Sequence, residues 1–205
     1  MLLTKKETII PKKLILCDVI SCKVILENLK KNLLKNINIE IEISTAEQDN
    51  LDSTIYKSDI IIGCTNKANI LDINRTHDNC IVLDDSIPHC FDIKQAKEKM
   101  SNSNCIFSEA GMLKNNTKIK EYRYSPKALI DIKDNLPGII WKRDYYEITS
   151  CILSAYLTDK FNASPTLGLP EVSTSYEHLK ILKKLNFTAA DYRLEGNLIS
   201  NSKQN

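Results

Sequence analysis

Polar and small residues follow a short apolar run near the middle of the chain, and their types could bind a ligand. The run Ile60–Ile62 is followed by Gly63, Thr65 and Asn66. Such a run predicts a buried strand, and the carboxyl end of a buried strand is where an open α/β sheet meets its ligand. Thr65 and Asn66 could hydrogen-bond a cofactor there, and Gly63 would permit its close approach. The alternative is a plain turn that ends the strand.

A second apolar run is followed by residues that could move a proton. Ile81–Leu83 precedes Asp85, Ser86 and His89, and Pro88 fixes the turn between them. An imidazole in this position could donate a proton or contact a phosphate, and Asp85 could bind the same cofactor. The alternative is a solvated loop histidine. Because no C-x-x-C pair accompanies the neighbouring cysteines, no metal site is predicted.

The chain lacks the phosphate loop with which dinucleotide-binding folds begin. That loop is a G-x-G-x-x-G turn between a strand and a helix, whereas the five glycines here are widely separated, at positions 63, 111, 138, 168 and 196. The first strand, Leu14–Cys17, ends at Asp18 and looks like the second strand of such a fold, after which an acidic residue takes the ribose hydroxyls. Asp18 is thus a candidate ribose ligand, with helix capping or solvated turn chemistry as the alternative.

The elements that would position these residues alternate along the chain. Short apolar runs predict five strands, at 14–17, 39–43, 60–62, 81–83 and 106–107. Helical spacing and composition predict two helices between them, at 24–34 and 93–100. The alternation implies crossover connections, and we therefore predict an α/β, Rossmann-like fold with a mostly parallel sheet that lacks its first Gly-rich βα unit.

The carboxyl-terminal part has a looser pattern that predicts a short helical region. Residues 112–143 are expected to be loop with one strand at 129–132, because Pro and Gly interrupt any longer element. Helices are predicted at 145–161 and 174–185. The apolar side of the first of these helices would carry Ile148, Ile152, Ala155 and Tyr156.

Composition narrows the class of protein. The 205 residues include 28 Lys and Arg against 26 Asp and Glu, for a net charge of +2. Because the lysines are spread along the chain, nucleic acid is not favoured as a partner. No apolar stretch approaches the roughly 18 residues of a membrane span, and no secretory signal is recognisable. The seven cysteines fit reduced, buried thiols, so we expect a cytoplasmic protein.

Four stretches, in their order along the chain, resemble the long-chain acyl-[acyl-carrier-protein] reductases of the cyanobacterial type. Enzymes of that family reduce a fatty acyl thioester to an aldehyde with NADPH. The matching stretches are 57–66, 80–89, 108–113 and 148–157. The resemblance extends over about residues 12 to 195 and corresponds to the carboxyl-terminal two thirds of the family. Stretch 57–66 is also similar to the NADP domains of shikimate dehydrogenases and glutamyl-tRNA reductases.

The resemblance implies roles for particular residues. It aligns Cys151 with the cysteine that takes the acyl group from acyl carrier protein or acyl-CoA, and a thiolate is well suited to attack a thioester. It places Gly111, together with the polar residues after Ile62, near the nicotinamide of NADP. Outside the resemblance, Cys151 would be a small apolar residue of a helix, and Gly111 would be a turn glycine.

The chain also departs from the family pattern. Ser154 stands where the family has an acidic residue, Asp85 and Ser86 replace two turn glycines, and His89 replaces a lysine. The amino-terminal substrate region and the Gly-rich loop have no counterpart. These departures predict weak binding of NADP and an enzyme that is truncated, or split so that a separate amino-terminal polypeptide completes it.

We therefore expect a partial Rossmann-like NAD(P)-binding domain at 12–113, a connector and helical region at 114–195, and a disordered tail at 196–205. The predicted function is NADPH-dependent reduction of an acyl thioester to an aldehyde through a cysteine thioester. Two alternatives stay open: a catalytically inactive remnant or binding module of this fold, and a shikimate-dehydrogenase-like NADP oxidoreductase.

Overall fold

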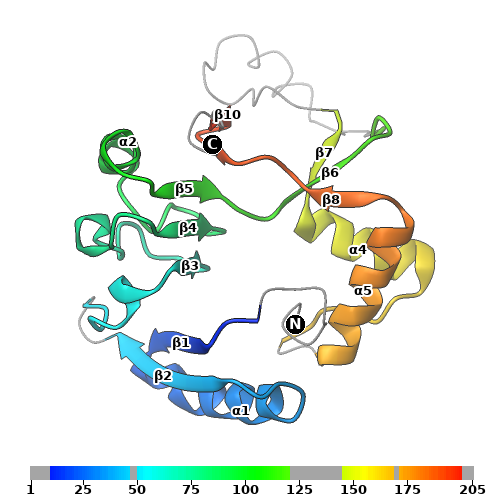
Figure 1. Ribbon diagram of the computed structural model, residues 1–205. Helices are drawn as coiled ribbons and strands as arrows, with labels where there is room; N and C mark the ends of the chain where they lie inside the picture. Colours follow the sequence, from blue (N-terminus) through cyan, green and yellow to red (C-terminus); the bar gives the residue numbers. More distant parts are fainter. Residues whose placement is uncertain (1–9, 47–49, 121–144, 169–170, 200–205) are drawn as a thin grey trace, which may run out of the picture. The chain divides into compact units, whose positions relative to one another are not determined.

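The structure is a computed structural model that describes residues 10–46, 50–120, 145–168 and 171–199. The chain divides into two compact units, Met1–Ser108 (unit 1) and Glu109–Asn205 (unit 2), and Figure 1 follows it from blue to red. Unit 1 is an α/β structure with parallel strand pairs, as predicted. The predicted domain boundary after residue 113 falls inside strand β6 (Met112–Asn115).

The first sheet of unit 1 consists of two parallel strands that a helix connects, which is a βαβ unit. Strand β1 (Lys13–Val19) pairs in parallel with β2 (Glu40–Ala46). Between them the chain forms the 3₁₀ turn η2 (Ile20–Cys22) and helix α1 (Lys23–Leu34). Of the apolar residues on α1, Leu26 is buried. Both strands and the helix fall where the apolar pattern predicted them.

The second sheet of unit 1 has the order β3-β4-β5 and carries the predicted site. Strands β3 (Ile60–Gly63) and β4 (Ile81–Asp84) are parallel, with Gly63 opposite Asp84 in the register. Strand β5 (Ile106–Glu109) follows β4 in the sheet. Because β3 and β4 are parallel neighbours, the residues that follow each of them are brought side by side.

Short helical elements connect these strands. The 3₁₀ turns η3 (Ile55–Lys57) and η4 (Ile73–Arg75) flank β3, and helix α2 (Ile93–Asn102) lies between β4 and β5. Asp92 is the predicted N-cap of α2, and its side chain accepts a hydrogen bond from Gln95 N at 2.8 Å. This bond satisfies one of the orphan donors of the first turn and fixes where the helix begins.

The core of unit 1 lies around two phenylalanines. Phe91 and Phe107 are almost completely buried, with ring centroids 5.4 Å apart in an edge-on arrangement. Ile73, Cys80 and Val82 are fully buried as well. Strand β4 and the segment after it therefore lie at the best-packed part of the unit.

Unit 2 differs from the helical region predicted from the sequence, because it contains an antiparallel sheet. Strand β6 pairs on one side with β7 (Glu147–Thr149) and on the other with β8 (Phe187–Ala189). The segment from Met112 was predicted to be loop, and this prediction is wrong over β6. The predicted strand at 129–132 lies outside the described residues.

Two helices and a short hairpin complete unit 2. Helix α4 (Ser150–Phe161) begins five residues later than predicted because β7 occupies its expected first turn, and α5 (Val172–Lys184) lies where a helix was predicted. Strands β9 (Arg193–Leu194) and β10 (Asn197–Leu198) pair antiparallel. The hairpin extends into the tail that was expected to be disordered from residue 196.

The buried face of α4 is also different from the predicted one. Leu153 and Leu157 are buried, whereas Ile152 and Tyr156 are 54% and 45% exposed. Ile148, the first residue of the predicted apolar face, belongs to β7 and pairs with Leu113. The predicted apolar face therefore began at a residue that precedes the helix, and the face that is buried is a different one. Within the described parts of the chain, no helix has the length and apolar character to cross a membrane.

Candidate functional site

The residues that follow β3 and β4 form one hydrogen-bonded cluster, which we call the β3–β4 strand end and define as residues 63–66 and 84–90. Asp85 N donates to Gly63 O at 2.8 Å, and Thr65 N donates to the Ser86 hydroxyl at 3.0 Å. These two bonds tie the segment after β3 to the segment after β4. The structure thus brings together Gly63, Thr65, Asp85 and His89, which the sequence assigned to one site.

Asp84 is the centre of this cluster, although sequence reasoning did not single it out. Its side chain is fully buried. One carboxylate oxygen, Oδ1, accepts a hydrogen bond from Ser86 N at 3.2 Å. The other, Oδ2, accepts from Cys90 N at 3.1 Å and lies 2.9 Å from His89 Nδ1. Two backbone N–H groups, the His89 ring and the Cys90 thiol therefore surround this carboxylate, and such partners are what a buried charge requires.

Contacts to the ring and to the backbone hold His89 against the core of unit 1. Its ring stacks on Phe91, with centroids 5.8 Å apart and planes 21° apart. Its carbonyl accepts from Asn69 N at 3.1 Å, and the next carbonyl, of Cys90, accepts from Leu71 N at 2.8 Å. The Ile87–Pro88 peptide that precedes His89 is cis. The His89 side chain is 27% exposed, so a fixed ring still reaches the surface.

Gly63 has a packing role at this strand end. A Cβ atom on Gly63 would lie 2.6 Å from Cys90 Sγ and 2.8 Å from Asp84 Oδ1. Both distances are far below van der Waals contact, so only glycine lets β3 approach the buried carboxylate. The close approach predicted for this glycine is therefore made by side chains of unit 1.

The polar side chains predicted to contact a cofactor differ in their exposure and in their hydrogen bonds within the protein. Asn66 and Asp85 are exposed, whereas Thr65 is half-buried and its hydroxyl accepts from Lys67 N at 3.1 Å. At the strand end, Asn66 and Asp85 are therefore the predicted cofactor contacts that present polar groups outward.

Two thiols belong to the strand end, and their surroundings disfavour the thiolate. Burial, followed by the Asp85 and Asp84 carboxylates, raises the pKa of the exposed Cys64. Burial, followed by a hydrogen bond to Asp84, raises the pKa of Cys90 far above the ordinary range. Neither cysteine is therefore an activated nucleophile at neutral pH.

Asp18, the predicted ribose ligand, lies at the end of β1. It is exposed, and its carboxylate accepts from the adjacent Val19 N at 2.7 Å. This bond is of the turn-forming kind that was weighed as the alternative. Among the contacts of the described residues, none joins Asp18 to the β3–β4 strand end. Asp18 stays a predicted ligand that the cluster does not include.

Cys151 and Gly111, the remaining predicted residues, lie together in unit 2. Gly111 has a φ of +77°, a conformation that favours glycine, and its carbonyl accepts from Ser150 N at 2.7 Å. Cys151 is the second residue of α4 and is exposed. Its thiol lies 3.4 Å from the Thr149 hydroxyl.

Ser154 marks a departure from the family pattern on the same helix. Its hydroxyl and that of Thr166 are 2.8 Å apart. The position expected to hold a carboxylate three residues after the thiol thus holds a neutral hydrogen-bonded pair. Unit 2 contributes no carboxylate from this position to act on Cys151.

The strand end does not offer a site for a cofactor pyrophosphate. Five backbone N–H groups in or next to it donate hydrogen bonds within the cluster, those of Thr65, Lys67, Asp85, Ser86 and Cys90. A pyrophosphate cradle is made of backbone N–H groups that point at the anion. The N–H groups of the strand end that are engaged in this way do not fit pyrophosphate binding.

No protein-family model matches the chain, and no curated protein sequence matches it significantly. Within the described residues, no group of three or more His, Cys, Asp or Glu side chains could hold a metal ion. The function must therefore be argued from the two clusters themselves.

Proposed function

We propose that the chain is the thiol-bearing part of an NADP-dependent oxidoreductase that reduces an acyl thioester to an aldehyde. The observation that carries this proposal is the exposed thiol of Cys151 in the first turn of α4, beside the Gly111 carbonyl that holds Ser150. The resemblance to acyl-[acyl-carrier-protein] reductases assigns the acyl-accepting role to the same residue. His89, fixed at the β3–β4 strand end, is the proposed proton-transfer group.

The acyl transfer needs only groups that the chain and the substrate supply. Cys151 Sγ attacks the thioester carbonyl carbon, a new Sγ–C bond forms, and the C–S bond to the carrier breaks. The proton lost by the Cys151 thiol ends on the departing carrier thiol. Because one thioester replaces another, the step is close to isoenergetic and the acyl group stays activated.

The reduction needs NADPH, which would supply the hydride that converts the acyl group to an aldehyde. The strand end does not fit the pyrophosphate, so the proposal includes a separate polypeptide that binds this part of the cofactor. Asn66 and Asp85 would contact the nicotinamide half. The same engaged N–H groups favour a second candidate function, an inactive remnant or binding module that retains the fold without the cofactor.

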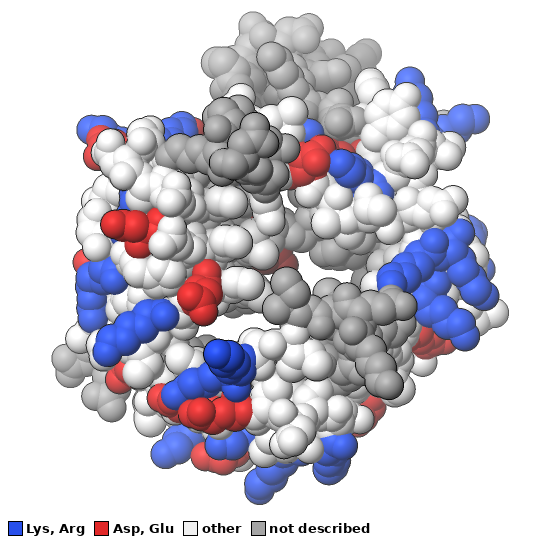
Figure 2. All heavy atoms as spheres, in the orientation of Figure 1, with Lys and Arg blue, Asp and Glu red and all other residues white. Residues whose placement is uncertain are grey.

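A basic surface on unit 2 supports a carrier protein as the acyl donor. Lys180, Lys183 and Lys184 are exposed on α5, which packs against α4, and Figure 2 shows blue side chains gathered there. Complementary charge steers association, so an acidic carrier would be attracted to the unit that holds Cys151. All seven cysteines are free, as suits a reducing compartment such as the cytoplasm.

The test is acylation of the chain by a long-chain acyl-CoA, followed by peptide mass spectrometry. The proposal predicts a hydroxylamine-labile acyl adduct on Cys151 that is lost in Cys151→Ser. The matched control is Cys64→Ser, which removes the other exposed thiol and leaves the Cys151 adduct unchanged. Equal acylation of Cys64 and Cys151, or none at either, would contradict an acyl-accepting role.

A second experiment separates the reductase from the inactive remnant. NADPH fluorescence is titrated with the chain alone and with the chain co-expressed with the polypeptide of the adjacent reading frame. The reductase predicts weak binding that tightens with the partner, followed by NADPH-dependent release of aldehyde from acylated Cys151. Absence of binding in both samples would favour the remnant.

A further inference from the structure

We infer that Asp84 is a positioning residue that holds His89 as its Nδ1–H tautomer, so that Nε2 is the ring atom that accepts a proton at the β3–β4 strand end. The catalytic meaning of this inference rests on the proposed function, whereas the tautomer itself can be measured without substrate or cofactor.

The donors around Asp84 determine which atom carries the shared proton. Ser86 N and Cys90 N are backbone N–H groups and can only donate, so both carboxylate oxygens act as acceptors. An ionised carboxylate accepts hydrogen bonds and donates none. For an ionised Asp84, the 2.9 Å contact between His89 Nδ1 and Asp84 Oδ2 thus has the proton on Nδ1.

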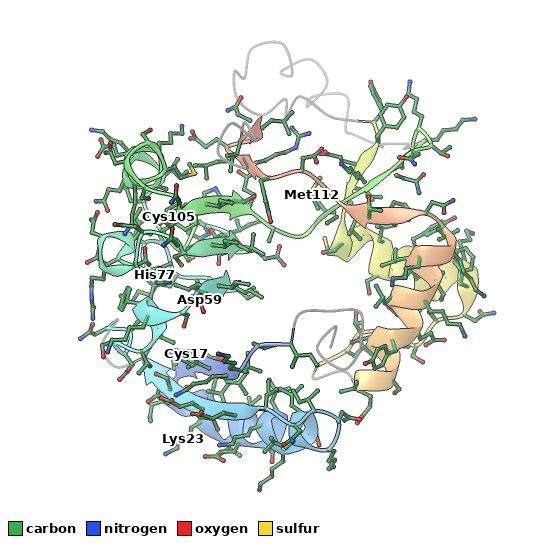
Figure 3. The ribbon with its side chains drawn as sticks, viewed as in Figure 1. Cys17, Lys23, Asp59, His77, Cys105 and Met112 are labelled. Carbon is green, nitrogen blue, oxygen red and sulfur yellow. The ribbon has the colours of Figure 1, made fainter. Side chains whose placement is uncertain are left out.

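The other two histidines of the chain have the opposite arrangement. His77 Nδ1 accepts from Asn79 N at 3.3 Å, so its proton is on Nε2, which faces Ser58 O at 3.2 Å. In Figure 3 His77 lies close to Asp59, and Asp59 Oδ1 is 3.8 Å from the same Nε2 atom. Histidine 178 directs Nε2 at the Ser164 carbonyl at 2.8 Å, which also requires an Nε2–H group.

Among the contacts between described residues, His89 is thus the histidine that has a carboxylate on Nδ1. A neutral imidazole with Nδ1–H carries its lone pair on Nε2, which is the basic atom. When Nε2 takes a proton, the imidazolium that forms lies against the Asp84 carboxylate, which stabilises it. His77 and His178 instead donate Nε2–H to backbone carbonyls and act as structural crosslinks.

The surroundings of Asp84 and His89 favour a single ring orientation. Stacking on Phe91 fixes the plane of the ring, and hydrogen bonds to the carbonyls of His89 and Cys90 hold the backbone that follows the His89 Cα atom. Gly63 leaves the space in which the carboxylate meets the ring. A group held in this way exchanges its proton from a defined place, which is what acid–base catalysis requires.

The test is a long-range ¹H–¹⁵N correlation spectrum of the ¹⁵N-labelled full chain, recorded where the imidazoles are neutral. The inference predicts two histidines with the Nε2–H pattern and one with the Nδ1–H pattern. The Nδ1–H pattern should disappear in His89→Gln, which assigns it. An Nε2–H pattern for His89 would overturn the inference, and this outcome needs no Asp84 variant.

Asp84→Asn then tests whether this carboxylate is the positioning group. A carboxylate on Nδ1 predicts a strongly downfield Nδ1–H proton that moves upfield when the acceptor becomes a neutral amide. Unchanged His77 and His178 patterns show that the variant is folded. An unmoved Nδ1–H proton would exclude Asp84 as its acceptor. Acylation of Cys151 is measured separately, so the proposed function can fail while the tautomer stands.

Discussion

The β3–β4 strand end of unit 1 and the amino end of α4 in unit 2 carry the two predicted reactive side chains, and they are built in opposite ways. His89 is fixed by a buried carboxylate, an aromatic ring and two backbone hydrogen bonds. Cys151 is exposed, and the Thr149 side chain makes no capping bond to the helix. Unit 1 therefore holds an imidazole ring in place, whereas unit 2 exposes a thiol at the beginning of a helix.

This comparison suggests where substitutions should act. Changes at the strand end should alter folding stability, because its polar groups are buried and mutually satisfied. Changes near Cys151 should alter reactivity and leave stability almost unchanged. The four predictions below test this contrast, in order of decreasing expected effect.

Asp84→Ala should destabilise the protein most. It removes the carboxylate that contacts His89 Nδ1 and leaves the Ser86 and Cys90 N–H groups buried without their acceptor. We expect about 3–5 kcal/mol of lost unfolding free energy. Chemical denaturation measures this loss. The matched control is the exposed neighbour Asp85→Ala, for which we expect a change within about 0.5 kcal/mol. Similar values for the two variants would contradict a buried, satisfied carboxylate.

Gly63→Ala should have the next largest effect. Its methyl group would overlap Cys90 Sγ and Asp84 Oδ1, and overpacking a site of this kind costs about 1–3 kcal/mol, with the upper value expected here. Gly168→Ala is the control. Apart from its chain neighbours, no atom of the described residues lies within 4 Å of the place that its Cβ atom would take. Only its positive φ of +59° opposes the substitution, at a cost of about 1 kcal/mol. If Gly63→Ala proves as mild as the control, the strand end has more room than the structure describes.

Alkaline pH should destabilise unit 1 through Cys80. Burial raises the pKa of this thiol from 9.0 to about 11. Between these two values the unfolded chain releases the proton while the folded chain keeps it, so the unfolding free energy falls as pH rises, by at most about 1.4 kcal/mol per pH unit. Cys80→Ala should make the pH dependence between pH 9 and 11 less steep without removing it, because the raised pKa of Cys90 acts in the same direction. Cys151→Ser, the control in unit 2, should leave the steepness unchanged.

Thiol alkylation should show the smallest difference and the most direct contrast between the two regions. At neutral pH iodoacetamide should label Cys64 several-fold more slowly than Cys151, since burial and two carboxylates raise the pKa of Cys64. Asp85→Asn removes one of these charges, so it should raise the labelling rate of Cys64 and leave the labelling rate of Cys151 unchanged. Peptide mass spectrometry gives both rates from one sample. Faster labelling of Cys64 than of Cys151 would reverse the comparison.

The sequence predicted the elements of unit 1 well because each is locally encoded. The run Ile60–Ile62 became β3, and Asp92 capped α2 as its position before strong helix formers indicated. Unit 2 was predicted less well, because a three-residue strand such as β7 has no periodicity of its own. Ile148 fits a helix as well as a strand in the sequence, and only its pairing with Leu113 decides between them.

The site was predicted in part for a similar reason. His89 and Asp85 stood out because they follow an apolar run. Asp84 did not stand out, because it is the last residue of β4 and its role depends on hydrogen-bond donors that only the fold brings near it. A carboxylate within an otherwise apolar strand is itself a signal, since a buried charge must find partners. Gly63 was selected for cofactor approach, and the atoms that need the space are Cys90 Sγ and Asp84 Oδ1.

The most direct test of the account follows backbone amide and histidine side-chain resonances of the ¹⁵N-labelled chain during titration with NADPH. The account predicts weak binding, with shifts concentrated at Cys64–Asn66 and Asp85–His89, and unchanged His178 signals. Resonances that stay fixed throughout the titration, or shifts confined to unit 2, would contradict the assignment of the β3–β4 strand end to the nicotinamide half of the cofactor.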